Sequence, residues 1–110
     1  MKTLFLREPS LSQYHIKLNL DERIDFLSAG RWIIQRAKGH RATSDDQLLA
    51  WMLYRAWPST HPPSILELGA GKGTISLILS ALWAQAQFVA IEAYEESHNL
   101  SLKNRTLNRI

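Results

Sequence analysis

Apolar and polar positions follow the clearest pattern in the second half of the chain, where short apolar runs are separated by stretches with helical spacing. In chain order, the pattern predicts a strand at residues 64–68, a glycine turn at 69–73, a helix at 74–84, a strand at 88–91 and a helix at 95–107. This order, with short links, is typical of parallel strands joined by right-handed crossovers. We therefore expect the opening of a doubly wound parallel α/β sheet.

The first half of the chain has a weaker pattern. It predicts a short helix at residues 20–27, a β-hairpin with strands at 31–35 and 40–43 around a turn at 37–39, and a longer helix at 44–57. Gly30 would end the short helix, because glycine favours the left-handed backbone at a helix terminus. Ser44 or Asp45 would cap the longer helix. Residues 1–57 thus form a helix–hairpin–helix segment that leads into the βαβα part at 58–110.

Composition restricts the kind of protein. The 110 residues suffice for one domain, and the 45% apolar fraction is enough for a hydrophobic core. The absence of cysteine excludes disulfides, cysteine nucleophiles and thiolate metal sites. A net charge of +3 permits nucleic-acid binding without requiring it. The most apolar window, residues 75–91, contains polar residues and is shorter than the ~20 residues of a membrane span, so we expect a cytoplasmic protein with no membrane contact.

The chain ends at Ile110, where the pattern would place a third strand. Two parallel strands alone leave the faces and edges of the sheet incompletely covered. We therefore expect this chain to be the first part of a larger domain, or to form a homodimer through its open sheet edge.

The strongest chemical signal lies at the glycine turn, where Glu67 is followed by Gly69, Gly71 and Gly73 in a G-x-G-x-G spacing. Glycines let backbone amides approach a ligand without a Cβ in the way, and the following helix directs its free N–H groups toward the same point. Glu92 follows the next strand, where a carboxylate can accept hydrogen bonds from two ribose hydroxyls. Together these features predict a site for a nucleoside-containing ligand.

Two phosphate-binding patterns fit these residues less well. The dinucleotide fingerprint G-x-G-x-x-G needs glycine or alanine where this chain has Thr74. The P-loop of nucleotide kinases resembles the run from Gly69 to Thr74, including Lys72, but its first glycine position is occupied by Leu66. In both patterns the charge of Glu67 would repel phosphates. A P-loop nucleotide kinase fragment is the main alternative function.

The run Glu67-Leu68-Gly69-Ala70-Gly71-Lys72-Gly73 resembles motif I of S-adenosylmethionine (SAM)-dependent methyltransferases, which have a Rossmann-like fold. The resemblance implies that Glu67 faces the cationic methionine end of the cofactor and that Glu92 holds the ribose. We expect Lys72, which is unusual in such a loop, to point to solvent. The implied cofactor-binding residues are Ser44, Asp45, Glu67, Gly69, Ala70, Gly71, Gly73, Glu92 and Ala93.

The segments around the glycine loop narrow this resemblance. Residues 24–35, 38–41, 44–50 and 104–108 are similar to segments of amino-methyltransferases related to the bacterial tRNA (adenine-N6)-methyltransferases, the methyltransferase small-domain group. By this resemblance Ser44 and Asp45 would close the methionine end of the pocket; capping the helix is their alternative role. Those enzymes carry an Asn/Asp-Pro-Pro-Tyr/Phe motif after the fourth strand, and no Asn-Pro or Asp-Pro occurs here.

The missing motif leaves the substrate unspecified. We expect a methyltransferase that modifies an amino group on RNA (tRNA) or protein, with catalytic residues unknown and with this chain inactive alone. Arg31, Arg36, Lys38, His40 and Arg41 form a basic stretch that can meet RNA phosphates or be an ordinary solvated face. The histidines lack ligand spacing, so no metal site is predicted. The remaining alternative is a non-catalytic partner that pairs its sheet edge with another chain.

Overall fold

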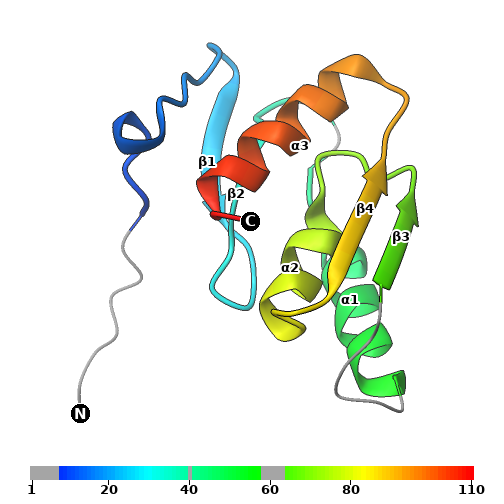
Figure 1. Cartoon of the computed structure of the whole chain (residues 1–110). Coiled ribbons are helices and arrows are strands. Elements are labelled where there is room, and N and C mark those ends of the chain that lie inside the picture. Colours follow the sequence, from blue (N-terminus) through cyan, green and yellow to red (C-terminus); the bar gives the residue numbers. More distant parts are fainter. Residues whose placement is uncertain (1–7, 40, 58–63) are drawn as a thin grey trace.

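A computed structural model describes residues 8–39, 41–57 and 64–110 of the chain, so His40 of the basic stretch lies outside the described residues. Two small sheets and three α-helices make up the described part (Figure 1). In chain order the elements are the 3-10 helix η1 (Ser12–Tyr14), β1 (Glu22–Phe26), β2 (Trp32–Arg36), α1 (Ser44–Ala56), β3 (Ser64–Leu68), α2 (Thr74–Leu82), β4 (Gln87–Ile91) and α3 (Glu95–Leu107).

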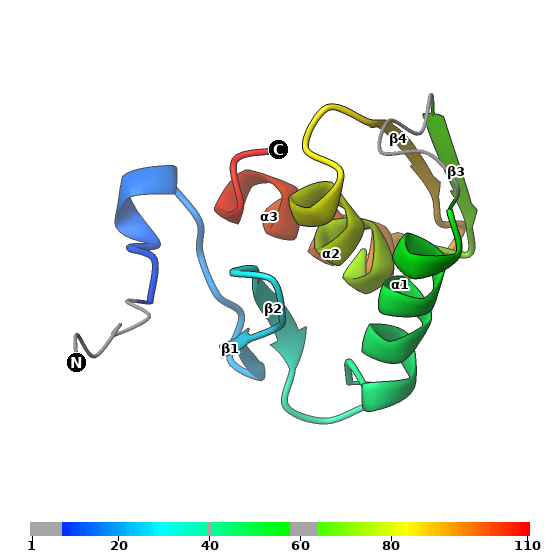
Figure 2. The ribbon, with the colours of Figure 1, turned by 90° about the horizontal axis from the view of Figure 1, so that it is seen from below.

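The second half of the chain folds as its pattern predicts. Strands β3 and β4 pair in parallel, with Ser64 opposite Gln87 and Leu68 opposite Ile91. Helices α1, α2 and α3 all lie on one side of this pair (Figures 1 and 2). The parallel pairing is confirmed. A doubly wound sheet has helices on both faces, so the described residues show a mixed α/β arrangement and not the full expected sheet.

In the first half, the helix predicted at 44–57 is confirmed as α1 and the strand predicted at 31–35 is confirmed as β2, whereas two other predictions fail. The expected helix at 20–27 is wrong, because β1 lies there and pairs antiparallel with β2. The expected hairpin around residues 37–39 is wrong for the same reason: those residues lead from β2 toward α1. The observed turn has Ala29 and Gly30 at its centre, with φ angles of 56° and 74°, and Arg31 N–H donates to the Ser28 carbonyl at 3.1 Å. Positive φ at both central residues is the requirement of a tight type I′ hairpin turn.

Packing between distant segments explains why the strand forms. Ile24 of β1 lies opposite Ile34 of β2, and both belong to an apolar cluster with Leu100 and Leu107 of α3. A helix at 20–27 would not provide this pairing. Gly30 does adopt the left-handed backbone that we predicted, but it serves a hairpin turn instead of a helix terminus.

Helix α2 lies at the centre of the larger apolar cluster. Three consecutive residues of the helix are buried, which indicates a helix surrounded by protein on most sides. The buried members of this cluster are Leu27, Ile33, Ala50, Leu77, Ile78, Leu79 and Trp83. The hairpin and α1 therefore both pack against α2, the helix that follows the glycine loop. No helix in the described ranges is both long and apolar enough to cross a bilayer.

The outer face of the β3–β4 pair is apolar and open among the described residues. Leu66, Leu68, Val89 and Ile91 are 51–72% exposed there. The neighbouring strand positions point the other way and pack against the larger apolar cluster.

Candidate functional site

The glycine loop turns from the end of β3 into α2 and touches the end of β4. Gly69, Gly71 and Gly73 have φ angles of 68°, 60° and 94°, which side-chain-bearing L residues rarely adopt. The N–H of Ala70 donates to the carbonyl of Ile91 at 3.0 Å, and Gly73 is the N-cap residue of α2. The loop therefore lies at the carboxyl ends of both parallel strands, which is where open α/β sheets bind ligands.

Glu92 follows β4 directly and faces this loop. Its Oε2 accepts a hydrogen bond from the N–H of Gly71 at 2.7 Å, and its Oε1 accepts one from the N–H of Tyr94 at 2.8 Å. The hydrogen bonds from Tyr94 and Gly71 lower the pKa of Glu92, so the side chain is charged at neutral pH. A carboxylate has about four acceptor positions, so both oxygens retain capacity for a hydroxyl donor. Ala93 is exposed at the same edge.

Glu67 borders a small cavity on the other side of the loop. The cavity has a volume of about 170 Å³ and is lined by Asp46, Glu67 and Lys72 with the uncharged residues 69–71, Thr74 and Ile75. Glu67 Oε2 accepts a hydrogen bond from the Ser76 hydroxyl at 2.7 Å. Burial raises the pKa of Glu67, and the hydrogen bond from Ser76 opposes that effect. A held, half-buried carboxylate of this kind gains most from a cationic ligand.

The start of α1 reaches the cavity through Asp46 and not through Ser44 or Asp45. Thr43 Oγ1 accepts a hydrogen bond from the N–H of Asp46 at 3.4 Å, and Asp46 Oδ2 accepts one from the N–H of Thr43 at 3.3 Å. This reciprocal pair is a capping box, so the expectation that Ser44 or Asp45 caps the helix is wrong. Ser44 and Asp45 are exposed and do not line the cavity, whereas Asp46 lines it together with Glu67.

Lys72 is buried, so the expectation that it points to solvent is wrong. Only 8% of the residue is exposed, and it lines both the Glu67 cavity and a neighbouring cavity of about 190 Å³. Burial lowers the pKa of Lys72, and the charge of Asp46 opposes this effect. The carbonyl of Lys72 accepts a hydrogen bond from Nδ2 of Asn104 at 3.0 Å, so α3 packs against the loop at this position and covers it.

Another cavity, of about 370 Å³, lies between α2, β4 and α3. Gly73, Ser76 and Phe88 are among its lining residues, and neither Glu67 nor Glu92 borders it. The charged groups that suit a cationic, hydroxyl-bearing ligand therefore gather at the smaller cavity and at the Glu92 edge, and not in this cavity of about 370 Å³.

The same arrangement of elements occurs in the crystal structure of the SAM-dependent methyltransferase from Agrobacterium tumefaciens. The two structures match with a TM-score of 0.66 over 84% of this chain, at 16% sequence identity. This chain has the fold of part of a SAM-dependent methyltransferase. It spans 30% of the length of the Agrobacterium protein. No family model and no curated protein matches the sequence.

Asn104 is a buried residue of this methyltransferase-like fold that the sequence pattern did not reveal. Its side chain is fully buried and contacts three backbone groups. Oδ1 accepts from the N–H of Ile34 at 2.5 Å, and Nδ2 donates to the carbonyls of Ile34 and Lys72 at 3.1 and 3.0 Å. One side chain of α3 therefore holds both β2 and the glycine loop.

Asn108 repeats this contact one helical turn later. Its Oδ1 accepts from the N–H of Trp32 at 3.0 Å, and its Nδ2 donates to the Trp32 carbonyl at 2.7 Å. Asn104 and Asn108 thus satisfy the backbone along one edge of β2, where a further strand would otherwise pair. The signal in the sequence is an asparagine in helical phase with Leu100 and Leu107.

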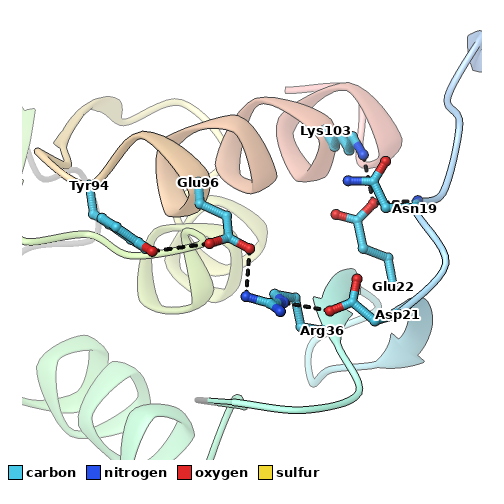
Figure 3. Close-up of polar contacts among 7 residues, drawn as sticks. All are labelled: Asn19, Asp21, Glu22, Arg36, Tyr94, Glu96 and Lys103. Carbon is cyan, nitrogen blue, oxygen red and sulfur yellow. Dashed lines mark hydrogen bonds and ion pairs between the residues drawn. The ribbon is translucent and has the colours of Figure 1, made fainter.

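Arg36 of the basic stretch contacts two carboxylates. Its guanidinium lies 2.6 Å from Asp21 and 2.6 Å from Glu96, and the Tyr94 hydroxyl donates to the same Glu96 at 3.1 Å (Figure 3). The hydrogen bond that Arg36 donates to the Asp21 carboxylate raises the pKa of Arg36. This network joins the hairpin to the segment that follows Glu92. Its arginine is therefore already neutralised by protein groups, whereas Lys38 nearby is exposed.

The other described arginines of this stretch are also engaged. Arg31 donates to the carbonyl of Leu77 at 3.1 Å and to the Ser80 hydroxyl at 3.0 Å, and burial lowers the pKa of Arg31. Arg41 lies 3.6 Å from Asp25. Arg31 therefore joins the hairpin to α2. The sequence pattern placed it only in a basic stretch and did not predict this structural role.

Proposed function

We propose that this chain binds SAM at the glycine loop and forms the cofactor-binding part of a methyltransferase. The observation that carries the proposal is the hydrogen bond that the N–H of Gly71 donates to the carboxylate of Glu92. It holds an ionised carboxylate at the end of β4 with acceptor capacity for ribose hydroxyls. Glu67 and Asp46 supply negative charge on the other side of the loop, which suits the ammonium and sulfonium of the methionine end.

The P-loop alternative is less well supported. A phosphate-binding loop directs its backbone N–H groups at phosphate oxygens. Here the N–H of Gly71 donates to the carboxylate of Glu92, so a protein anion occupies that direction. A phosphate beside the loop would also face the charges of Asp46 and Glu67.

The methyl acceptor in this proposal is an amino group on RNA or protein. Its basis is the similarity of residues 24–35 and 44–50 to the tRNA (adenine-N6)-methyltransferase group. The basic stretch favours neither acceptor, because its described arginines contact protein carboxylates, carbonyls or a hydroxyl. Methyl transfer requires the acceptor about 3–3.5 Å from the reacting carbon, and no acceptor-holding Asn-Pro or Asp-Pro occurs here. We expect the chain alone to be inactive.

A non-catalytic, self-associating partner is the second candidate function. The exposed apolar face of the β3–β4 pair favours it, because Leu66, Leu68, Val89 and Ile91 lie together there. Sedimentation at several protein concentrations tests this candidate. A homodimer that dissociates when Leu68 is replaced by Lys would support association through the open sheet, and a monomer at every concentration would rule it out.

Calorimetry with S-adenosylhomocysteine tests the cofactor proposal. Glu92→Ala should weaken binding about 10- to 150-fold, the value of one charge-assisted hydrogen bond of about 1.5–3 kcal/mol. Glu95→Ala is the matched control, because Glu95 is an exposed carboxylate three residues later and should bind as the parent protein does. ATP with Mg²⁺ should not bind. Equal affinity of the Glu92 and Glu95 variants, or tight ATP binding, would contradict the proposal.

A further inference from the structure

Three charged side chains surround the small cavity beside the glycine loop. Asp46, Glu67 and Lys72 line it, and the other lining residues are uncharged. Burial raises the pKa of Glu67 and lowers that of Lys72; the charge of Asp46 adds to the first effect and opposes the second. They therefore form one electrostatic cluster, contributed by α1, β3 and the loop itself.

The charge pattern of this cluster is two carboxylates and one ammonium. The methionine end of SAM carries the opposite pattern: an ammonium and a sulfonium, both positive, and one carboxylate. At about 170 Å³ the cavity is smaller than the roughly 300 Å³ of a site for a whole drug-sized ligand, which suits one end of the cofactor. Asp46 and Glu67 alone would attract the ammonium and the sulfonium of SAM but would repel its carboxylate.

Lys72 supplies the cation that the two acids lack. It lies between Gly71, whose N–H donates to Glu92, and Gly73, the N-cap residue of α2. Burial of a lysine is costly unless its charge is compensated, and here the residue is buried at the wall of a cavity that Asp46 also lines. Lys72 therefore places a positive charge at the wall of the cavity that Asp46 and Glu67 also line.

Building on the proposed function, we propose that Lys72 binds the carboxylate of the methionine end of SAM and thereby makes the site selective for ligands that carry an α-amino acid group. Asp46 and Glu67 face the ammonium and the sulfonium. Lys72 is a specificity-determining residue in this arrangement, and its role differs from that of a P-loop lysine, which contacts phosphates.

Decarboxylated S-adenosylmethionine tests this assignment, because it differs from SAM in lacking only the carboxylate. The parent protein should bind SAM about tenfold or more tightly than the decarboxylated ligand, as measured by calorimetry at pH 7. Lys72→Met should reduce this ratio to about one. Lys72→Arg, which keeps the positive charge, should retain part of the preference. Lys38→Met, at an exposed lysine of the neighbouring cavity, is the control and should keep the full ratio.

The outcomes separate the two proposals. A parent protein that binds both ligands equally well would overturn the role of Lys72 and leave SAM binding intact. An unchanged ratio in a folded Lys72→Met variant would overturn it in the same way. A parent protein that binds neither ligand would overturn the proposed function and this inference together. The parent ratio decides the question even where Lys72→Met fails to fold.

Discussion

Replacement of Asn104 by alanine should destabilise the protein more than any single hydrogen bond would suggest. The side chain is fully buried and serves three backbone groups, the N–H and carbonyl of Ile34 and the carbonyl of Lys72. Alanine removes the side chain that serves these three backbone groups and leaves them without a hydrogen-bond partner in the protein interior. The change therefore acts on strand β2 and on the glycine loop at once.

The expected magnitude follows from the number of groups left without a partner. A buried donor or acceptor without a partner costs about 1–3 kcal/mol, so three such groups cost roughly 3 kcal/mol at the lower end. Partial relaxation and entry of water keep the value near that end. Because small domains are stable by about 5–15 kcal/mol, a loss of about 3 kcal/mol removes a large share of the free energy of unfolding.

Urea unfolding followed by tryptophan fluorescence measures this effect, since Trp83 is buried in the larger apolar cluster. Asn99→Ala is the matched control: it is the same substitution on the same helix at an exposed position, and it should change the free energy of unfolding by less than about 0.5 kcal/mol. Equal stability of the Asn104 and Asn99 variants would refute the claim that Asn104 holds the strand and the loop.

Two further changes test the site and the hairpin. Burial raises the pKa of Glu67, so the charged form of Glu67 opposes folding at neutral pH, and this penalty is relieved as the pH falls below the raised pKa. Glu67→Gln removes the charge and should therefore raise the thermal unfolding midpoint at pH 7 and make that midpoint less dependent on pH. The same variant should weaken SAM binding. A glutamine variant that is less stable than the parent at pH 7 would contradict this sign. Ala29 has a φ angle of 56° before Gly30, so Ala29→Asn should raise the free energy of unfolding by about 1 kcal/mol, as an Asn-Gly type I′ turn predicts. A loss of stability in urea unfolding would argue against that turn.

Local periodicity was sufficient to predict the second half of the chain. Strand β3 and helix α3 have the predicted bounds, and α2 and β4 differ from prediction by only a few residues. The glycine spacing likewise predicted a loop at the carboxyl ends of the strands. Gly69, Gly71 and Gly73 adopt positive φ angles there, which residues with a side chain rarely adopt. Glu67 lies two residues before the loop and Glu92 directly follows the next parallel strand, so both fall at the edge of the sheet where the loop lies.

The first half and the polar contacts of the core depended on packing between distant residues. The local pattern predicted a helix at residues 20–27, but the conformation of residues 22–26 is decided by pairing with β2 and contact with α3. Lys72 is buried because α3 covers the loop, and Asp46 reaches the cavity because α1 packs beside α2. The contact of Asn104 with Ile34 joins residues 70 positions apart. The helical phase of Asn104 places it on the buried face of α3, but the local pattern does not identify its partner, because the free energy of the hydrogen bond arises only when both segments are buried together.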